Sequence, residues 1–426
     1  MNGLKFAGFG DDAKRTGLSV KDAAARLLRF AYMEKRSMFF GAAQMVPVSD
    51  RQLKTFLGRL QYYAGERCNL LRHRLRQLRV PKIRIEAIPD TSLAVLMDEA
   101  MHSYGDTEIA GTALWLHQSL LESYRKYLSE TNPLADSPTC DAMESFLPRL
   151  RQMVDWLKIY LKQNHREGDQ FERLETFLDA AGALDGTKAR PAKESPRQRS
   201  KEAFVIPRSP GRGTGIPRVW DYVKPPMESV DEYLAYMIGI RLSEINVAEG
   251  LSIVLCETPK MSWEFYHDIS RHLWDEVRHS VMGEAAATVT FGSLEKIPMR
   301  DYESVYCMES EPLEQYATLG LEIEGAQMKY PVGKRGEWEF CKDAAKNVLM
   351  TTFQDYDWAD EVLHVNIARR QLTDWFPNGL QELSTYAEKG KANRAEVKAR
   401  KEPVRLSEIM REANEESESR IQKSEV

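Results

Sequence analysis

The sequence predicts an all-α protein with two helical bundles in one chain. Long segments carry apolar residues with a period of 3.6, and alternating, strand-like runs are nearly absent. The chain has 426 residues, of which 42% are hydrophobic and 29% are charged, so it can form two domains with cores of their own. The pattern Asp-Glu-x-x-His also occurs in both halves, which suggests two diverged copies of one module.

The first half contains candidate helices that we expect to form one bundle over residues 1–180. N-cap signals precede two of them, at Ser49-Asp50 and at Asp90-Thr91-Ser92. The apolar periodicity predicts helices over residues 19–44, 50–79, 91–106, 108–130 and 138–164.

The periodic pattern then fails over residues 181–227. Within this stretch, residues 186–218 carry nine Lys and Arg against two Glu, and Pro and Gly recur throughout. This composition predicts a linker between the two bundles. Its basic charge could contact an acidic partner or nucleic acid, but we expect a solvated linker.

Helical patterning resumes in a second bundle, which we expect over residues 228–387. Thr258-Pro259 ends its first helix, Ser262 can cap the next, and Tyr330-Pro331 ends another. Residues 388–426 are charged and poor in aromatic residues, so we expect a frayed or partner-dependent tail outside the core. The predicted helices span residues 229–257, 262–290, 298–307, 311–329, 338–353 and 355–374.

Composition excludes several classes of protein. The net charge of -5 gives no overall nucleic-acid or membrane footprint, and no run of eighteen apolar residues occurs. Five scattered cysteines without a Cys-x-x-Cys pair argue against a disulfide framework and a zinc ribbon, and favour a reducing compartment. The N-terminus lacks an apolar signal region, so we expect a cytoplasmic protein, without a membrane partner and with homo-oligomerisation left open.

The Asp-Glu-x-x-His pattern is the strongest functional signal. On a helix, residues three apart lie on one face, so each Glu and His can present an oxygen and a nitrogen to one metal ion. Two such helices, with two more that each give a Glu, make the ligand set of a dimetal carboxylate bundle. The three copies are Asp98-Glu99-Ala-Met-His102, Asp275-Glu276-Val-Arg278-His279 and Asp360-Glu361-Val-Leu-His364.

The second half holds two of these copies and therefore needs a partner Glu for each. Antiparallel helices joined by a short loop place ligands at one height when they are roughly 30 residues apart. Glu244 lies 32 residues before Glu276, whereas Glu249 lies only 27 before it. We therefore expect Glu244 as the ligand, with Glu249 as the alternative.

For Glu361 the choice of partner is less clear. Glu324 lies 37 residues before it and Glu322 lies 39 before it. The two are about 200° apart around a helix, so only one can point inward, and the apolar pattern does not choose between them. Spacing slightly favours Glu324, and Glu322 stays the alternative.

Residues beside the motifs can support the ligands. Asp275 and Asp360 could each accept the free imidazole N–H of the histidine on the opposite helix, and Arg278 could keep one of these carboxylates ionised. His272 and Asp357 lie one turn before the motif Glu residues. Either could be a further ligand, but we expect them to have supporting or surface roles.

The segments DEVRH and DEVLH resemble the Asp-Glu-x-x-His helices of the ferritin-like superfamily. The resemblance covers residues 230–375 well and residues 50–165 in a degraded form. It implies a centre of two metal ions that reacts with dioxygen or peroxide and oxidises a small organic substrate, with an external electron donor as a further partner. Carboxylate-rich ligand sets suit two iron ions, two manganese ions or a mixed pair. The alternative is a non-catalytic metal-binding or scaffold protein of the same fold.

The first half departs from the ligand pattern. Glu66 lies 33 residues before Glu99, and Glu122 is on the following helix. No second Glu-x-x-His follows in residues 146–161, where the pattern requires one. We therefore expect that this half has lost its metal and keeps Glu99 and His102 in a remnant polar network.

Overall fold

The protein is all-α, as the periodicity predicts. A computed structural model describes residues 7–164, 170–191, 196–331, 333–373 and 375–411. Within these residues the strands are β1 (Arg218–Val219) and β2 (Met299–Arg300), which form a short parallel pair. Residues 192–195 of the predicted linker and 412–426 of the predicted tail lie outside the described residues.

The chain divides into two compact units. The first comprises Met1–Gln44 and Leu60–Ile206, and the second comprises Met45–Arg59 and Pro207–Val426. None of the helices in the described residues is both long enough and apolar enough to cross a membrane.

In the first unit, α5 packs on α6, and α4 and α5 both pack on α7. The Asp90 side chain caps α4 by accepting a hydrogen bond from the backbone N–H of Ser92, as the sequence predicts. The predicted helix over residues 91–106 is interrupted, because α4 ends at Met101 and α5 begins at Gly105 with a positive φ of 73°. The helices are α1 (Val20–Met45), α2 (Arg51–Gln77), α3 (Lys82–Glu86), α4 (Thr91–Met101), α5 (Gly105–Glu130), α6 (Ser137–Gln163) and α7 (Gln170–Ala180). Met45 of α1 and residues 51–59 of α2 belong to the second unit.

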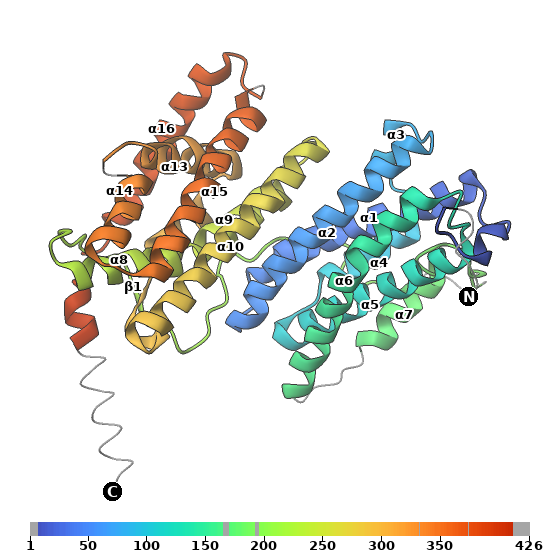
Figure 1. The fold of residues 1–426 in the computed structure, drawn as a ribbon, viewed down its shortest axis with the longest axis horizontal. Helices are drawn as coiled ribbons and strands as arrows, with labels where there is room; N and C mark the ends of the chain where they lie inside the picture. Colours follow the sequence, from blue (N-terminus) through green and yellow to red (C-terminus); the bar gives the residue numbers. More distant parts are fainter. Residues whose placement is uncertain (1–6, 165–169, 192–195, 332, 374, 412–426) are drawn as a thin grey trace, which may run out of the picture. The chain divides into compact units, whose positions relative to one another are not determined.

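The second unit is built around α10 and α15, which pack side by side (Figure 1). Helices α8 and α9 pack on α10, and the π-helical segment η3 (Thr318–Ile323) packs on α15 and α16. A second π-helical segment, η4 (Phe340–Ala344), continues α14. The helices are α8 (Val230–Ser243), α9 (Ile245–Glu257), α10 (Trp263–Phe291), α11 (Tyr302–Glu309), α12 (Pro312–Ala317), α13 (Glu324–Gln327), α14 (Lys334–Glu339), α15 (Val348–Thr373) and α16 (Gly379–Lys398).

Several predicted helices of the second half differ in the structure. The predicted helix over 229–257 is broken at Glu244 into α8 and α9, and the one over 311–329 contains η3 between α12 and α13. Most positions of α8 and α9 are buried, so the apolar pattern runs on through the break. The predicted boundary near residue 354 lies inside α15, which begins at Val348.

Helix α16 extends the packed part of the chain beyond residue 387. It contacts α12 and η3, and Leu383, Ala387 and Val397 on it are buried. Residues 388–398 of the predicted tail therefore belong to a packed helix, because these widely spaced apolar residues are enough to dock a charged helix.

Candidate metal centre

Helix α10 presents three potential ligands on one buried face. Ser262 starts the helix by accepting a hydrogen bond from the backbone N–H of Phe265, as the sequence predicts. His272, Glu276 and His279 follow at spacings of four and three residues, which aligns them on one side of the helix. Their exposed fractions are 0%, 2% and 0%. Charged and polar groups buried to this extent require partners.

Helix α15 repeats the arrangement. Asp357, Glu361 and His364 have the same spacings of four and three residues, and all three are buried. Because α10 and α15 pack together, the two polar faces meet in the interior of the second unit.

The side chains form two groups in which one potential ligand atom from each residue lies within 4.8 Å of the others. Each group takes one further residue from another segment. Glu324 begins α13, directly after η3, and Glu244 lies at the junction of α8 and α9. We call the groups site A (His272, Glu276, Glu324 and His364) and site B (Glu244, His279, Asp357 and Glu361).

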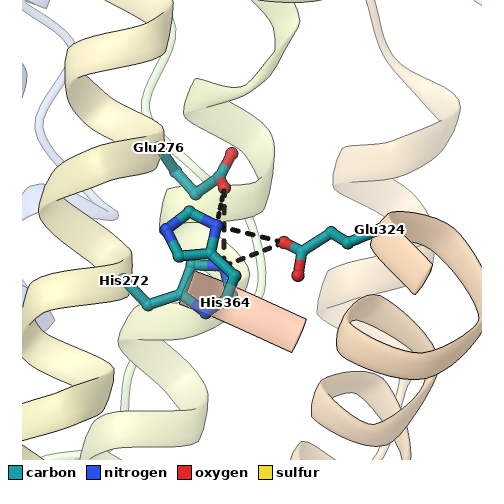
Figure 2. A group of neighbouring side chains, drawn as sticks. All are labelled: His272, Glu276, Glu324 and His364. Carbon is teal, nitrogen blue, oxygen red and sulfur yellow. Dashed lines mark hydrogen bonds and ion pairs between the residues drawn. The ribbon is translucent and has the colours of Figure 1, made fainter. Parts of the chain in front are cut away.

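Site A combines two imidazole rings with two carboxylates (Figure 2). Nε2 of His272 lies 2.9 Å from Oε1 of Glu324 and 3.4 Å from Oε1 of Glu276. Nδ1 of His364 lies 3.5 Å from the same oxygen of Glu324 and 3.6 Å from the same oxygen of Glu276. The two rings stack with their centroids 3.7 Å apart.

Site B combines one imidazole ring with three carboxylates. Nδ1 of His279 lies 3.5 Å from Oδ1 of Asp357 and 3.7 Å from Oε2 of Glu244. Glu276 of site A also reaches this ring, because its Oε2 lies 3.9 Å from Nδ1 of His279. Glu276 thus turns one oxygen toward each site.

Two buried cations accompany site B. Nζ of Lys334 lies 2.7 Å from Oδ2 of Asp357 and 3.0 Å from Oε1 of Glu361, and its residue is only 1% exposed. The Arg241 guanidinium pairs with Glu244 and donates a 2.6 Å hydrogen bond to Oδ2 of Asp357. Site B therefore places three carboxylates against two permanent or near-permanent positive charges.

The outer nitrogens of two histidines meet carboxylates across the helix pair. Nε2 of His279, on α10, lies 3.1 Å from Oδ2 of Asp360 on α15. Nε2 of His364, on α15, lies 3.3 Å from Oδ2 of Asp275 on α10. Arg278 donates hydrogen bonds to both Asp275 and Asp360. These contacts leave Nδ1 of each ring turned toward its site, and their role toward a metal stays a prediction.

Burial and neighbouring charges shift the pKa values of site B. Burial raises the pKa of Glu244 to about 8 and that of Glu361 to about 7. Burial also opposes ionisation of Asp357, but Arg241 and Lys334 outweigh it and lower the pKa of Asp357 to about 2. Burial disfavours the charged form of His279, yet Asp357 and Asp360 raise its pKa to about 9. A metal ion must therefore displace protons to bind here.

In site A the carboxylate of Glu324 is held ionised. Burial opposes its charge, but His272 and His364 outweigh that effect and lower the pKa of Glu324 well below its usual range. Asp275 and the same Glu324 carboxylate raise the pKa of His364, against the effect of burial. Protons on the imidazoles stand in for the positive charge that the carboxylates need.

A metal ion fits the hydrogen-bonding state of both sites. All eight residues have a buried oxygen or Nδ1 atom without a hydrogen-bond partner among the described residues. Buried polar atoms in native proteins nearly always have a partner, and a bound cation would supply one to the carboxylates and the imidazoles of these groups. The atoms are Oε2 of Glu244, Nδ1 of His272, Oε1 of Glu276, Nδ1 of His279, Oε2 of Glu324, Oδ1 of Asp357, Oε2 of Glu361 and Nδ1 of His364.

The structure brings the expected residues of the second half together and adds two. Glu244, Glu276, His279, Glu324, Glu361 and His364 all belong to site A or site B. His272 and Asp357 belong there too, and both are 0% exposed, so the surface role allowed for them is excluded. Ligation of a metal by these eight residues stays a prediction.

The alternative carboxylates lie elsewhere. Glu249 is buried, but it is paired with Lys54 and Arg212. Oε2 of Glu322 accepts a 2.7 Å hydrogen bond from Nζ of Lys391 on α16. The π-helical turn explains why periodicity could not separate Glu322 from Glu324, because an extra residue per turn shifts the phase of the helix at this point.

The residues named as a remnant site in the first half form no such group among the described residues. Glu99 is buried and pairs with Arg173 and Arg199. His102 is only half-buried, and its ring packs edge-on against Phe204. Glu66 is half-buried and Glu122 is exposed.

Sequence reasoning missed a buried polar network in the first unit. Arg67 donates two hydrogen bonds to Glu34, at 2.6 and 2.8 Å, and the Tyr124 hydroxyl donates a third at 2.6 Å. The guanidinium supplies the positive charge that the buried carboxylate needs. The sequence also contained no indication of the two cations beside site B, Lys334 and Arg241, because neither lies at a spacing that a motif defines.

No family model, curated protein or solved structure matches the chain. The interpretation of sites A and B therefore depends on their own residues.

Proposed function

We propose that the second unit binds two metal ions, one at site A and one at site B, and activates dioxygen to oxidise an organic substrate. The observation that carries the proposal is the convergence of eight buried carboxylate and imidazole side chains from four separate segments, each with a buried polar atom that lacks a hydrogen-bond partner among the described residues. The ferritin-like pattern of Glu and Glu-x-x-His helices supports it.

The donor set favours iron or manganese. The two sites together supply five carboxylates and three imidazoles, and such hard, oxygen-rich sets suit these ions better than zinc. Among the described residues, no cysteine belongs to either site. This disfavours metals that prefer thiolate ligands. When bound, a pair of iron or manganese ions would supply the redox chemistry needed to reduce dioxygen.

The residues of the chain hold and orient these ions. Glu276 faces both sites and is placed to bridge them, while His279 and His364 present Nδ1 because Asp360 and Asp275 engage their other nitrogens. Burial of all eight residues keeps bulk water away from the oxidising centre.

Metal analysis tests the binding step. We expect about two metal ions per chain in the purified protein, and loss of most of this metal in Glu324→Gln. The matched control is Glu322→Gln, which makes the same chemical change two residues away on a side chain paired with Lys391. Equal metal content in the two variants, or none in the wild-type protein, would contradict the proposal.

Oxygen exposure separates an oxygen-activating enzyme from a protein that only binds metal. The protein is loaded with Fe(II) without oxygen and then mixed with oxygenated buffer. A ferric absorbance band that forms rapidly, and that a reductant bleaches through repeated cycles, supports the enzyme. Iron that stays ferrous or oxidises only at the rate of free iron would leave the non-catalytic alternative.

A further inference from the structure

The two sites differ in charge because of one exchange in an otherwise repeated pattern. The α10 set begins with His272 where the α15 set begins with Asp357, at the same spacing to the following Glu and His. Site A therefore has two carboxylates, and site B has three. A third buried carboxylate is costly unless a positive charge lies beside it.

Lys334 supplies that charge from outside the repeated pattern. It is the first residue of α14, and its Nζ contacts Asp357 at 2.7 Å and Glu361 at 3.0 Å. Its ammonium group is therefore bound by two of the three carboxylates that would hold an ion at site B. At 1% exposure, the group is also removed from solvent.

Site A has no comparable cation. Among the described residues, Glu276 and Glu324 form ion pairs only with histidines. The carboxylates of site A thus depend on imidazole protons or on a metal ion for their neutralisation, whereas those of site B already have a fixed partner.

We propose that Lys334 is a built-in cation of site B that makes the two metal sites unequal. This inference rests on the proposed metal centre. Site A takes the first divalent ion. The second ion binds more weakly, because it must share Asp357 and Glu361 with the Lys334 ammonium or displace it, and two positive charges a few ångströms apart repel each other.

The arrangement also stabilises the metal-free protein. With Lys334 and Arg241 in place, each of the three carboxylates of site B has a positively charged partner without metal. A chain that loses its second ion therefore keeps α14 docked on α15, which these contacts join.

Cobalt(II) titration of the metal-free, full-length protein under anaerobic conditions tests the inference by calorimetry and by the visible d–d absorption. In the wild-type protein we expect a first equivalent and a second that binds on the order of ten- to a hundred-fold more weakly. Lys334→Gln should bring the second affinity to within a few-fold of the first. Lys329→Gln is the control, because it removes the same charge from an exposed position five residues away.

A second readout uses thermal unfolding without metal. Lys334→Gln should lower the melting temperature of the metal-free protein, and cobalt should raise it by more than in the wild type. If Lys334→Gln does not fold, Lys334→Met tests the loss of the same positive charge while keeping the length of the side chain. Lys334→Arg keeps the charge and should retain the unequal affinities of the two sites.

The outcomes separate this inference from the proposed function. Two equal cobalt sites in the wild type, or a second affinity that neutral variants at Lys334 leave unchanged, would overturn the role of Lys334 and leave the metal centre standing. No cobalt binding at the first equivalent would overturn the proposed function itself, and the inference with it.

Discussion

The carboxylate of Asp275 lies 3.3 Å from Nε2 of His364, on the opposite helix of the central pair. Asp275 also accepts hydrogen bonds from Arg271 at 2.8 Å and from Arg278 at 2.7 Å. Burial opposes its charge, but His364 and Arg271 outweigh it and lower the pKa of Asp275 well below its usual range. The carboxylate therefore stays ionised, and it fixes the His364 ring with Nδ1 toward site A.

Replacing this carboxylate should weaken metal binding at site A. We expect Asp275→Asn to lower the affinity about 10–100-fold, because the amide is a poorer acceptor and no longer fixes the ring. Competition for cobalt(II) with a coloured chelator measures the change. Asp268→Asn is the control on the same helix, since Asp268 pairs with Arg370 and not with a site residue. Equal affinities in the two variants would show that Asp275 does not support a ligand.

A close helix contact next to His364 leads to a second prediction. A Cβ atom added at Gly320, in η3, would lie 2.2 Å from Cβ of Ala368 on α15. We expect Gly320→Ala to destabilise the protein by about 1–3 kcal/mol, because neither backbone can yield without moving α15. Denaturant unfolding measures the loss, and metal content should fall with it.

Two further variants isolate the contact. Ala368→Gly should restore part of the stability of Gly320→Ala, because it removes the atom that the new methyl group meets. A Cβ atom added at Gly325, in α13, would lie 3.4 Å from its nearest neighbour, the carbonyl oxygen of Gly320, which is an ordinary van der Waals contact. Gly325→Ala should therefore not destabilise the fold. A double variant no more stable than Gly320→Ala alone would rule out this steric cause.

The sequence indicated the motif residues that the structure brings together, because Glu-x-x-His spacing on a helix depends only on local geometry. It undervalued His272 and Asp357, since a residue one turn before a ligand faces the site only if the helix stays straight and its partner lies close. It could not choose between Glu322 and Glu324, because the π-helical turn in η3 breaks the period on which the comparison depended.

The cations of site B could not be predicted from spacing at all. Lys334 begins a short helix that follows a loop, so its approach to Asp357 is set by tertiary packing and not by a repeat. The break at Glu244 could not be predicted for a related reason, since residues 241–246 are all buried and leave no polar face to mark where one helix ends.

The buried cluster around Glu249 gives a third prediction. Glu249 is 0% exposed and pairs with both Lys54 and Arg212. We expect Glu249→Gln to cost about 3–5 kcal/mol of stability, because it leaves the buried Lys54 ammonium and the half-buried Arg212 guanidinium without their common carboxylate. The metal content of the folded variant should equal that of the wild type, since Glu249 belongs to neither site.

Glu257→Gln, on the same helix, is the matched control for Glu249→Gln. Glu257 pairs with the partly exposed Arg208, so its replacement should cost less than about 1 kcal/mol. Loss of metal from Glu249→Gln, with the protein still folded, would instead indicate that Glu249 is a ligand.

His117 in the first unit makes the stability of the fold depend on pH. Its Nδ1 lies 2.8 Å from the carbonyl oxygen of Ala113, and the residue is 0% exposed. Burial, with the nearby charge of Arg67, lowers the pKa of His117 from 6.5 to about 3. Between these two values the unfolded chain binds a proton that the folded chain does not, so the free energy of unfolding falls as the pH falls.

We therefore expect His117→Leu to flatten the acid side of the stability profile. In the wild-type protein, His117 should lower the free energy of unfolding by up to about 1.4 kcal/mol for each pH unit below 6.5, and should have no effect above that pH. The difference in unfolding free energy between wild type and variant, measured in urea from pH 7 to pH 4, isolates this contribution from that of the carboxylates. His73→Leu removes an exposed histidine and should leave the slope unchanged. A wild-type slope retained in His117→Leu would mean that His117 is charged in the folded protein, with its proton stabilised despite the adjacent Arg67.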